Sequence, residues 1–364
     1  MEKLLLENNI IQKERDYFSA YNKYLWRKRL VLLILLALML AAAILSITAG
    51  SSGLSLKDVL LTLIGKGTAK SNIIVWNVRL PRIVTAVVVG CALALAGCVM
   101  QNVLRNPLAS ASTLGVSQGA SFGAAIAIIC FSAGVQHNAT TNGAINISDP
   151  YMVTVFAFIG GIISVVIILG LSRIKTITPS SMVLAGVALS SLFTGGTALV
   201  QYFADDVVLA AVVYWTFGDI GRASWTEILI IAIILLLSFI YFFCKSWSYN
   251  SLQNGIHTAK SLGVNVDSLI LISMTLCCLL SATAVAFVGI INFIGLVAPH
   301  IARKFVGNDH RFLLPASAMT GACVLLISDL FARMIVSPVI LPIGAVTSFL
   351  GAPLFLYLIY KGAK

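Results

Sequence analysis

The sequence has few charged residues for its length: Asp, Glu, Lys and Arg make up 10% of its 364 residues. A soluble globular protein carries roughly 25%. Hydrophobic residues make up 59%, which the core of a soluble protein of this size cannot hide. The composition therefore predicts an integral membrane protein. The net charge of +11 does not indicate a nucleic-acid partner, because basic residues of membrane proteins collect in cytoplasmic loops.

Motifs for catalysis and metal binding are also missing. The seven cysteines form no CxxC pair and no Cys/His cluster, and they lie in or beside apolar runs, as small packing residues do. There is no Walker lysine motif, no HExxH, no GxSxG and no pair of carboxylates in an apolar run. The sequence thus predicts no catalytic residue, no metal site and no cofactor bound by this chain. The first thirty residues are polar and charged, which does not fit a cleavable signal peptide.

The apolar runs predict an all-α fold with about ten transmembrane helices, because a spanning helix needs about 20 mainly apolar residues. The third helix is rich in small residues, which let helix backbones approach closely. The eighth is expected to be short and irregular, because Gly295 and Pro299 interrupt it. A polar N-terminal segment, 1–29, precedes a single membrane domain, 30–364. The expected helices lie near residues 30–49, 82–104, 112–133, 151–171, 181–202, 226–244, 268–290, 291–306, 313–335 and 341–360.

Basic residues predict the orientation. Ten spans place both termini on one side, and that side receives the basic cluster at 23–29 and most other Lys and Arg. The opposite side receives the acidic loop at 205–219. By the positive-inside rule, the termini and the polar stretch 245–267 of this multi-pass protein are expected to be cytoplasmic. The first outer loop, 50–78, breaks the rule with several basic residues, so these are expected to have a role.

The two halves of the sequence resemble each other weakly. Segments 95–109 and 287–303 each contain a Gly, then a polar amide (Gln101 or Asn292), then a Pro. Inverted repeats are a common transporter plan with the pathway at their interface, so we expect two inverted five-helix halves. Pathway or gating candidates are the polar and proline residues of these segments: Gln101, Asn106, Pro107, Asn292, Pro299 and His300. For His300, a structural role at a helix end competes with a proton relay or metal ligand.

Three arginines mark the expected outer mouth. Arg79 and Arg82 flank a proline in RLPR, and Arg333 follows Asp329 near the outer end of the ninth helix. Two interpretations of RLPR are open: interfacial snorkelling and docking of carboxylates. For Arg333, a pair with Asp329 one helical turn away is the structural alternative. Three outward arginines also suit bidentate capture of carboxylates on a partner.

The polar stretch 245–267 interrupts two strongly apolar runs. It contains helix-compatible residues and two glycines, and it predicts one or two short helices outside the membrane. Because the chain has no nucleotide site and no ion-coupling carboxylates of its own, an energised transporter must take energy from a partner. This stretch is where we expect that partner to dock.

Several motifs resemble the FecCD family, the permease subunits of ABC importers for iron(III)-siderophores, haem and cobalamin. They cover the second to tenth expected helices in the family's order, whereas residues 1–29 lie outside the resemblance. The matching pieces are RLPR (79–82), the AG…MQ…RNPLA run (96–109), LGVSQGASFGA (114–124), WTFGDIGRASW (215–225), AKSLGV (259–264), FIGLVAPHIAR (293–303), SDLFAR (328–333) and LPIGAVTSFLGAPLF (341–355).

The resemblance implies a complex of two permease subunits, here expected to be identical copies. Two cytoplasmic ATPases holding ATP and Mg and an outer substrate-binding protein complete it. It implies that Arg79, Arg82 and Arg333 meet glutamates on the two lobes of the binding protein. It also implies that stretch 245–267 carries the coupling helices that enter a groove on the ATPase, and the best-matching positions are Gly255, Ala259, Leu262 and Gly263.

The predicted function is therefore the permease subunit of a binding-protein-dependent ABC importer for a metal chelate, not an enzyme. One alternative is a secondary transporter driven by an ion gradient, which needs a titrating group such as Asp329 or His300. Another is a membrane enzyme, for which no catalytic constellation is visible. A departure from the family also stands out before LPIG, where residues 338–340 are Pro, Val and Ile instead of including an acid.

Overall fold

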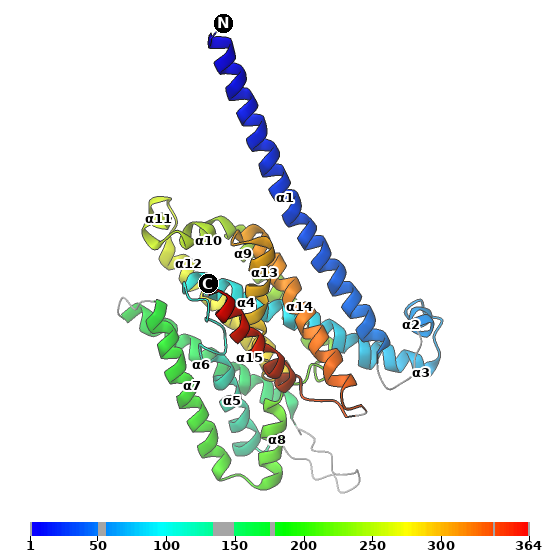
Figure 1. Ribbon diagram of the computed structural model, residues 1–364. Coiled ribbons are helices and arrows are strands. Elements are labelled where there is room, and N and C mark those ends of the chain that lie inside the picture. The colour runs from blue at the N-terminus through cyan, green and yellow to red at the C-terminus, as the bar shows by residue number, and fades with distance from the viewer. Residues whose placement is uncertain (1, 50–55, 134–148, 175–178, 338, 363–364) are drawn as a thin grey trace.

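The computed structural model describes residues 2–49, 56–133, 149–174, 179–337 and 339–362, and within these ranges it contains helices and no strand (Figure 1). The elements in chain order are α1 (Glu2–Thr48), α2 (Leu56–Leu63), α3 (Ala69–Asn72), the π-helical η1 (Ile73–Arg79), α4 (Leu80–Val103), α5 (Val116–Cys130), α6 (Pro150–Ile174), α7 (Pro179–Tyr202), α8 (Asp206–Thr216), α9 (Trp225–Cys244), α10 (Ser246–Gln253), α11 (Ile256–Ser261), α12 (Val266–Val288), α13 (Ile294–Val306), α14 (His310–Met334) and α15 (Ile343–Gly362).

Seven of the described helical stretches are long and apolar enough to cross a membrane, and shorter apolar helices accompany them. The all-α membrane fold expected from the sequence is confirmed. The seven stretches are Phe18–Thr48, Ala69–Val103, Pro150–Leu171, Ser181–Tyr202, Trp225–Cys244, Val266–Val288 and His310–Met334. The shorter apolar helices are Val116–Cys130, Asp206–Thr216 and Ile343–Tyr357.

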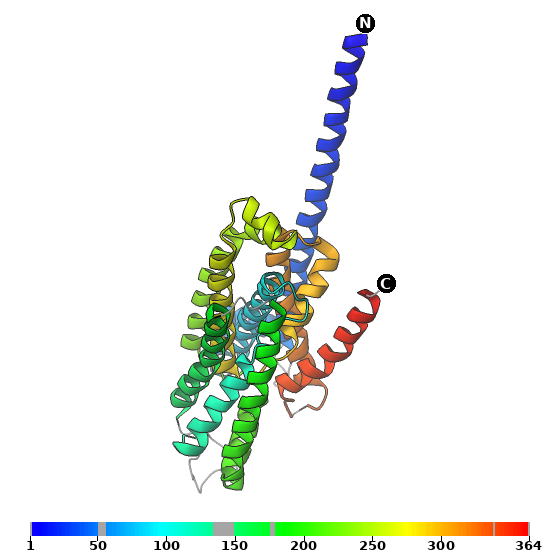
Figure 2. The ribbon, with the colours of Figure 1, turned by 90° about the vertical axis from the view of Figure 1, so that its left-hand side faces the viewer.

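Helix α1 runs without a break through the expected boundary at residues 29 and 30. The basic cluster at 23–29 lies inside this helix, and the N-terminal half projects well beyond the bundle (Figures 1 and 2). The root of the projecting part is packed: the Lys28 ammonium donates to the Tyr24 hydroxyl and lies 5.1 Å from the ring centre of Phe312 in α14. Residues 2–29 are therefore the first turns of the same helix that enters the membrane domain.

The loop assignment of segment 205–219 is wrong. The outer linker 50–78 is more helical than expected, although its expected amphipathic piece at 54–64 agrees with α2. Segment 205–219 contains α8, whose apolar run is too short for a span and whose flanking acids suggested a loop. Its Trp215 is buried. The outer segment before the second helix contains α2, α3 and η1, and helical backbone is continuous from Ala69 to Val103. Pro81, which has no N–H to donate, lies just after the π-helical η1, where the hydrogen-bond pattern changes to that of α4.

The break between α12 and α13 agrees with the expected irregular eighth helix. Gly289 and Phe293 flank it with positive φ angles of 79° and 66°. Helix α13 is short and carries Pro299 inside it. The break turns the chain so that α13 packs back against α4.

Helix α4 lies at the centre of the bundle and approaches α13 and α14 at glycines. A Cβ atom on Gly97 would lie 1.9 Å from the carbonyl oxygen of Gly295, so these two backbones touch. The similar segments 95–109 and 287–303 are thus packed against each other. Helices α5 and α6 meet in the same way, as the small residues of the third helix predicted, with Gly119 facing Gly160. The inverted relation of the two halves stays a prediction.

Candidate functional site

Asp329 is the centre of a buried ion cluster at one end of the bundle. Its carboxylate is fully buried in α14, with Oδ1 2.8 Å from Nε of Arg82 and Oδ2 3.0 Å from Nε of Arg333. Arg82 also reaches Asp219, in the turn after α8, at 3.3 Å. The backbone N–H of Gly221 donates to the same Asp219 oxygen. The cluster therefore joins α4, α14 and the α8–α9 turn.

Arg333 of this cluster and the neighbouring Arg79 hold the C-terminal end of α1. Arg333 donates to the carbonyl oxygens of Ala49 at 3.0 Å and Ser46 at 3.1 Å. Arg79 donates to the carbonyls of Ile47 and Thr48. The last carbonyls of a helix have no partner within it, so the two guanidinium groups act as a C-terminal cap for α1.

The three predicted docking arginines are thus brought together, but they are directed inward. Arg79 and Arg82 are 5% and 8% exposed. The pairing of Asp329 with Arg333 could be predicted from the sequence, because the two residues are four positions apart on one helix. The Arg82–Asp329 contact, 247 residues apart, had no local signal. Docking of a partner protein at these arginines stays a prediction.

Helices α10 and α11 lie at the opposite end of the bundle, the end from which α1 projects (Figure 1). The sequence predicted one or two short helices in stretch 245–267, and the structure has two. Gly255 (φ 119°) starts α11 and Gly263 (φ 80°) follows it, and both angles favour glycine. Ala259 is completely buried, whereas Leu262 is 65% exposed. Among the four predicted coupling residues, Leu262 therefore offers a large apolar side chain to a partner, and Ala259 anchors α11.

A polar network fastens α10 to the helices behind it. Asn250 donates to the carboxylate of Asp309 at 2.9 Å and accepts from the backbone N–H of His310 at 2.8 Å. The buried Tyr249 pairs with the hydroxyl of Ser273 in α12 at 2.6 Å, and its carbonyl accepts from Asn102 of α4. These hydrogen bonds would therefore transmit a movement of α10 to α4, α12 and α14 together. The spacing of these residues in the sequence does not predict the network.

Asp309 stays charged in this network. Burial raises the pKa of its carboxyl, but hydrogen bonds from Arg311 and Asn250 outweigh burial and hold the pKa at about 2. An ordinary Asp titrates near 3.8, so the folded pKa is depressed. The stabilisation is complete above about pH 4 and is lost as the pH falls towards 2.

The gating candidates partly converge. Gln101 donates to the carbonyl of Gly295 at 3.3 Å and accepts from Arg303 at 3.2 Å. Nε2 of His300 lies 3.1 Å from the carbonyl oxygen of Pro107. A carbonyl oxygen can only accept a hydrogen bond, so Nε2 carries a proton and donates. His300 thus links α13 to the turn after α4.

The other gating candidates lie nearby but have local roles. The Asn106 side chain accepts from the backbone N–H of Leu108 and shapes the same turn. Pro299 is buried inside α13, and Asn292 lies in the α12–α13 break.

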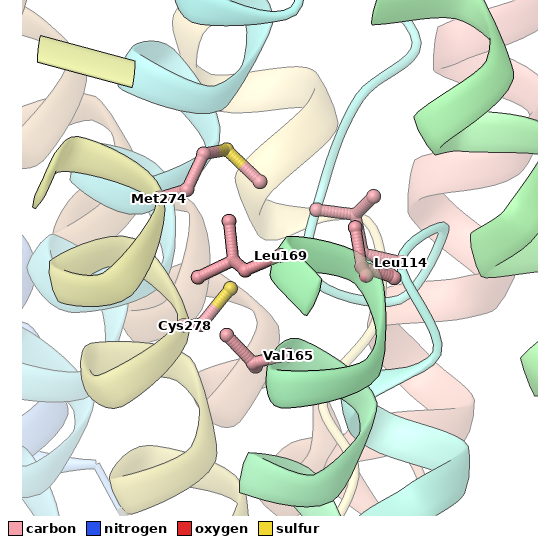
Figure 3. Close-up of a pocket in the computed structure, with 6 residues that line it drawn as sticks. Leu114, Val165, Leu169, Met274 and Cys278 are labelled. Carbon is pink, nitrogen blue, oxygen red and sulfur yellow. The ribbon is translucent and has the colours of Figure 1, made fainter. Parts of the chain in front are cut away.

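The described residues form no metal cluster, and their interior contains a small apolar pocket. No group of three or more His, Cys, Asp or Glu is placed to hold a metal among the described residues. A pocket between Leu114, α6 and α12 has a purely apolar lining that includes Val165, Met274 and Cys278 (Figure 3). It contains no group that could recognise a polar or charged molecule.

Residues 37–361 match the FecCD transport family. The chain belongs to this family. The FecCD match leaves out the projecting half of α1 and includes both ends of the bundle described above. With the membrane-spanning helices, it identifies a multi-pass protein of the prokaryotic plasma membrane.

Proteins similar in sequence to this chain are named as transport permeases. A protein of Methanocaldococcus jannaschii named as an ABC transporter permease is 52% identical over 96% of this chain and 99% of its own length. The hemin transport permease of Yersinia pestis is 37% identical over 92% of this chain and 96% of its own. Further relatives are named for import of Fe(3+)-citrate and vitamin B12. A solved metal-chelate-type ABC transporter in an inward-facing conformation is 30% identical, with a TM-score of 0.77 over 92% of this chain and 99% of that one.

Proposed function

We propose that the chain is the transmembrane permease subunit of a binding-protein-dependent ABC importer. It carries an iron(III)-siderophore or a related metal chelate, such as haem or cobalamin, into the cytoplasm by ATP-driven alternating access. The observation that carries this proposal is the α10–α11 pair in a FecCD chain. The pair lies outside the apolar body, exposes Leu262 and is fastened by Asn250 and Tyr249 to three long helices.

Membership of the FecCD family supports the proposed composition of the rest of the complex. Two separate ATP-binding subunits hold ATP and Mg and press on α10–α11 from the cytoplasm. A second, identical copy of this chain completes the pathway, and an outer binding protein delivers the chelate to the end marked by Arg79, Arg82 and Arg333. Both termini face the cytoplasm, in agreement with the basic residues at 23–29.

An ion-gradient mechanism fits the side chains less well. Asp329 is paired with two guanidinium groups, and His300 is engaged by the Pro107 carbonyl. A coupling ion or proton would have to displace these partners. Uptake by the purified chain in liposomes without ATPase subunits would favour that mechanism over ours.

Proline at position 259 tests the coupling role of α11. The N–H of Ala259 donates to the carbonyl of Gly255 at 3.0 Å, and proline removes this bond and clashes with the preceding turn, at a cost of about 3 kcal/mol. That is enough to unfold a six-residue helix. We expect Ala259→Pro to abolish chelate uptake into proteoliposomes carrying the ATPase subunits, while ATP hydrolysis continues and the thermal midpoint of the membrane helices is unchanged.

The matched control is Ile256→Pro. Position 256 is the first of α11, where an N–H has no helical partner and proline is tolerated. Uptake by this control should persist. If Ala259→Pro also retains uptake, the coupling role of α11 is refuted.

Charge reversal tests the docking role of the arginines. Because Arg79 and Arg333 also cap α1, the double Arg79→Glu, Arg333→Glu variant needs its thermal stability recorded beside its affinity for the binding protein in nanodiscs. Losing one side of a buried charge pair at an interface costs about 2–5 kcal/mol, so affinity should fall by a factor of about 30 or more. Lys66→Glu, an exposed reversal in the same outer segment, should have little effect.

A second variant separates docking from folding. Asp219 is the more exposed partner of Arg82, with 35% of its side chain accessible. If a carboxylate of the binding protein replaces it, Asp219→Asn removes a competitor and should tighten docking. Unchanged affinity in both the folded double variant and Asp219→Asn would eliminate the docking role.

A further inference from the structure

A polar cavity of 370 Å³ lies beneath α10, apart from the apolar pocket and from the buried cluster around Asp329. Its walls come from the end of α4, the following turn, α10, α13 and the α13–α14 turn. The side chains that give it its chemistry are Gln101, Asn102, Arg105, Gln253, Arg303 and His310. A volume of this size is typical of small-molecule sites.

The cavity has an excess of positive charge. Two of its lining residues are arginines and none is acidic. Arg105 forms no ion pair with any described residue, and Arg303 donates to the neutral amide of Gln101 at 3.2 Å. Asp309, next to His310 in the chain, is occupied by Arg311 and Asn250. Two guanidinium groups in one cavity therefore lack an anion within the described part of the chain.

A buried histidine fixes one wall of the cavity. His310 is 1% exposed, and its Nδ1 lies 3.0 Å from the amide nitrogen of Gln253 and 3.1 Å from Oδ1 of Asn250. Both partners belong to α10, so the ring joins α10 to the start of α14 beside the two arginines.

The backbone at Arg105 points to a specific need for its side chain. Arg105 follows α4 with a φ of 46°, the left-handed conformation in which helices commonly end on glycine. Arginine has a steric cost there that glycine lacks. Such strain is found at functional positions and is a reason to look for a ligand. Arg105 is also exposed, so an anion can reach it from solvent.

We propose that this cavity binds an oxyanion, either a carboxylate or a phosphate. Arg105 and Arg303 supply the charge, because the guanidinium fork matches the two oxygens of such groups. The anion has two possible sources, a carboxylate of the transported chelate and free inorganic phosphate. Gln253 of α10 and Asn102 of α4 line the same cavity, so an occupied site ties the proposed coupling helix to the central helix of the bundle.

Binding can be measured on the purified full-length chain in nanodiscs. Thermal midpoints are recorded while inorganic phosphate or citrate is titrated at constant ionic strength, with chloride as the reference anion. Either titration that saturates supports the site: phosphate alone identifies free phosphate as the source, and citrate alone identifies a carboxylate. Absence of a saturable shift with both anions overturns the proposal.

The decisive variant is Arg105→Gly. It removes the guanidinium and relieves the left-handed backbone, so the midpoint without anion should be unchanged or higher. The anion affinity should fall at least about tenfold, because a hydrogen bond to a charged group contributes about 1.5–3 kcal/mol. Arg303→Gln should weaken binding similarly.

The matched control is Lys304→Gln, which removes the same charge from the exposed neighbouring position on α13. It should bind as the wild type does. Equal weakening in Lys304→Gln and Arg303→Gln would show general charge screening and refute the site. The measurement needs neither ATPase nor transport, so its result is independent of the importer proposal.

Discussion

Asp329→Ala is expected to produce the largest loss of stability of any single substitution considered for this chain. The carboxylate is completely buried and lies 2.8 Å from Arg82 and 3.0 Å from Arg333. Removing one partner of a buried ion pair costs about 3–5 kcal/mol, because the other charge is left uncompensated. Here two guanidinium groups lose their partner. Thermal unfolding of the purified chain in detergent should show a strongly lowered midpoint.

Asp219→Ala is the matched comparison. It removes an acid from the same cluster, but the Asp219 side chain is 35% exposed and its contact with Arg82 is longer, 3.3 Å. Partly exposed pairs contribute about 1 kcal/mol or less, so the midpoint should change little. A similar loss in both variants would contradict the view that Asp329 is the structural centre of the cluster.

Gly97→Ala should have the second largest effect. The added Cβ would lie 1.9 Å from the oxygen, 2.6 Å from the carbon and 2.7 Å from the Cα atom of Gly295. All three are backbone atoms, so no rotamer change can relieve the clash and α13 must move away from α4. Overpacking typically costs about 1–3 kcal/mol, and a backbone clash belongs at the upper end. The displacement should also break the contact of Gln101 with the Gly295 carbonyl.

Gly195→Ala provides the control within another membrane helix. A Cβ at position 195 of α7 has nothing within 4 Å in the described structure. Because alanine favours helix over glycine by about 1 kcal/mol, this variant should be as stable as the wild type or slightly more so. If Gly97→Ala unfolds at the wild-type temperature, the close α4–α13 contact is not important for stability.

Long apolar runs made most of the fold predictable. The spans beginning at 150, 181, 225 and 266 lie within a few residues of their expected positions, because their length and composition allow no other arrangement in a membrane. Helix α8 was missed because its apolar run is only 11 residues long and begins at an acid. The continuous α1 was missed because polar residues outside a membrane carry no signal that separates a helix from a loop.

The candidate sites were predictable only as far as local spacing reaches. Gly255 and Gly263 lie at the two ends of α11, and Asp329 pairs with Arg333 one turn along the helix. The contacts that define each site join distant parts of the chain, such as Asn250 to Asp309 and Arg82 to Asp329. Such contacts depend on how helices pack, and a single sequence does not record that.

The continuity of α1 makes it one rod that is held at two points. Arg79 and Arg333 bind the carbonyls at its C-terminal end, and Lys28 packs against Phe312 of α14. Its other end projects past α10 and α11 (Figure 1). At about 1.5 Å per residue the part before Lys28 is about 40 Å long, so a tilt of about 5° at the Phe312 contact would move the far tip by about 3 Å. A small change in the packing of α14 would therefore be enlarged at the tip of α1.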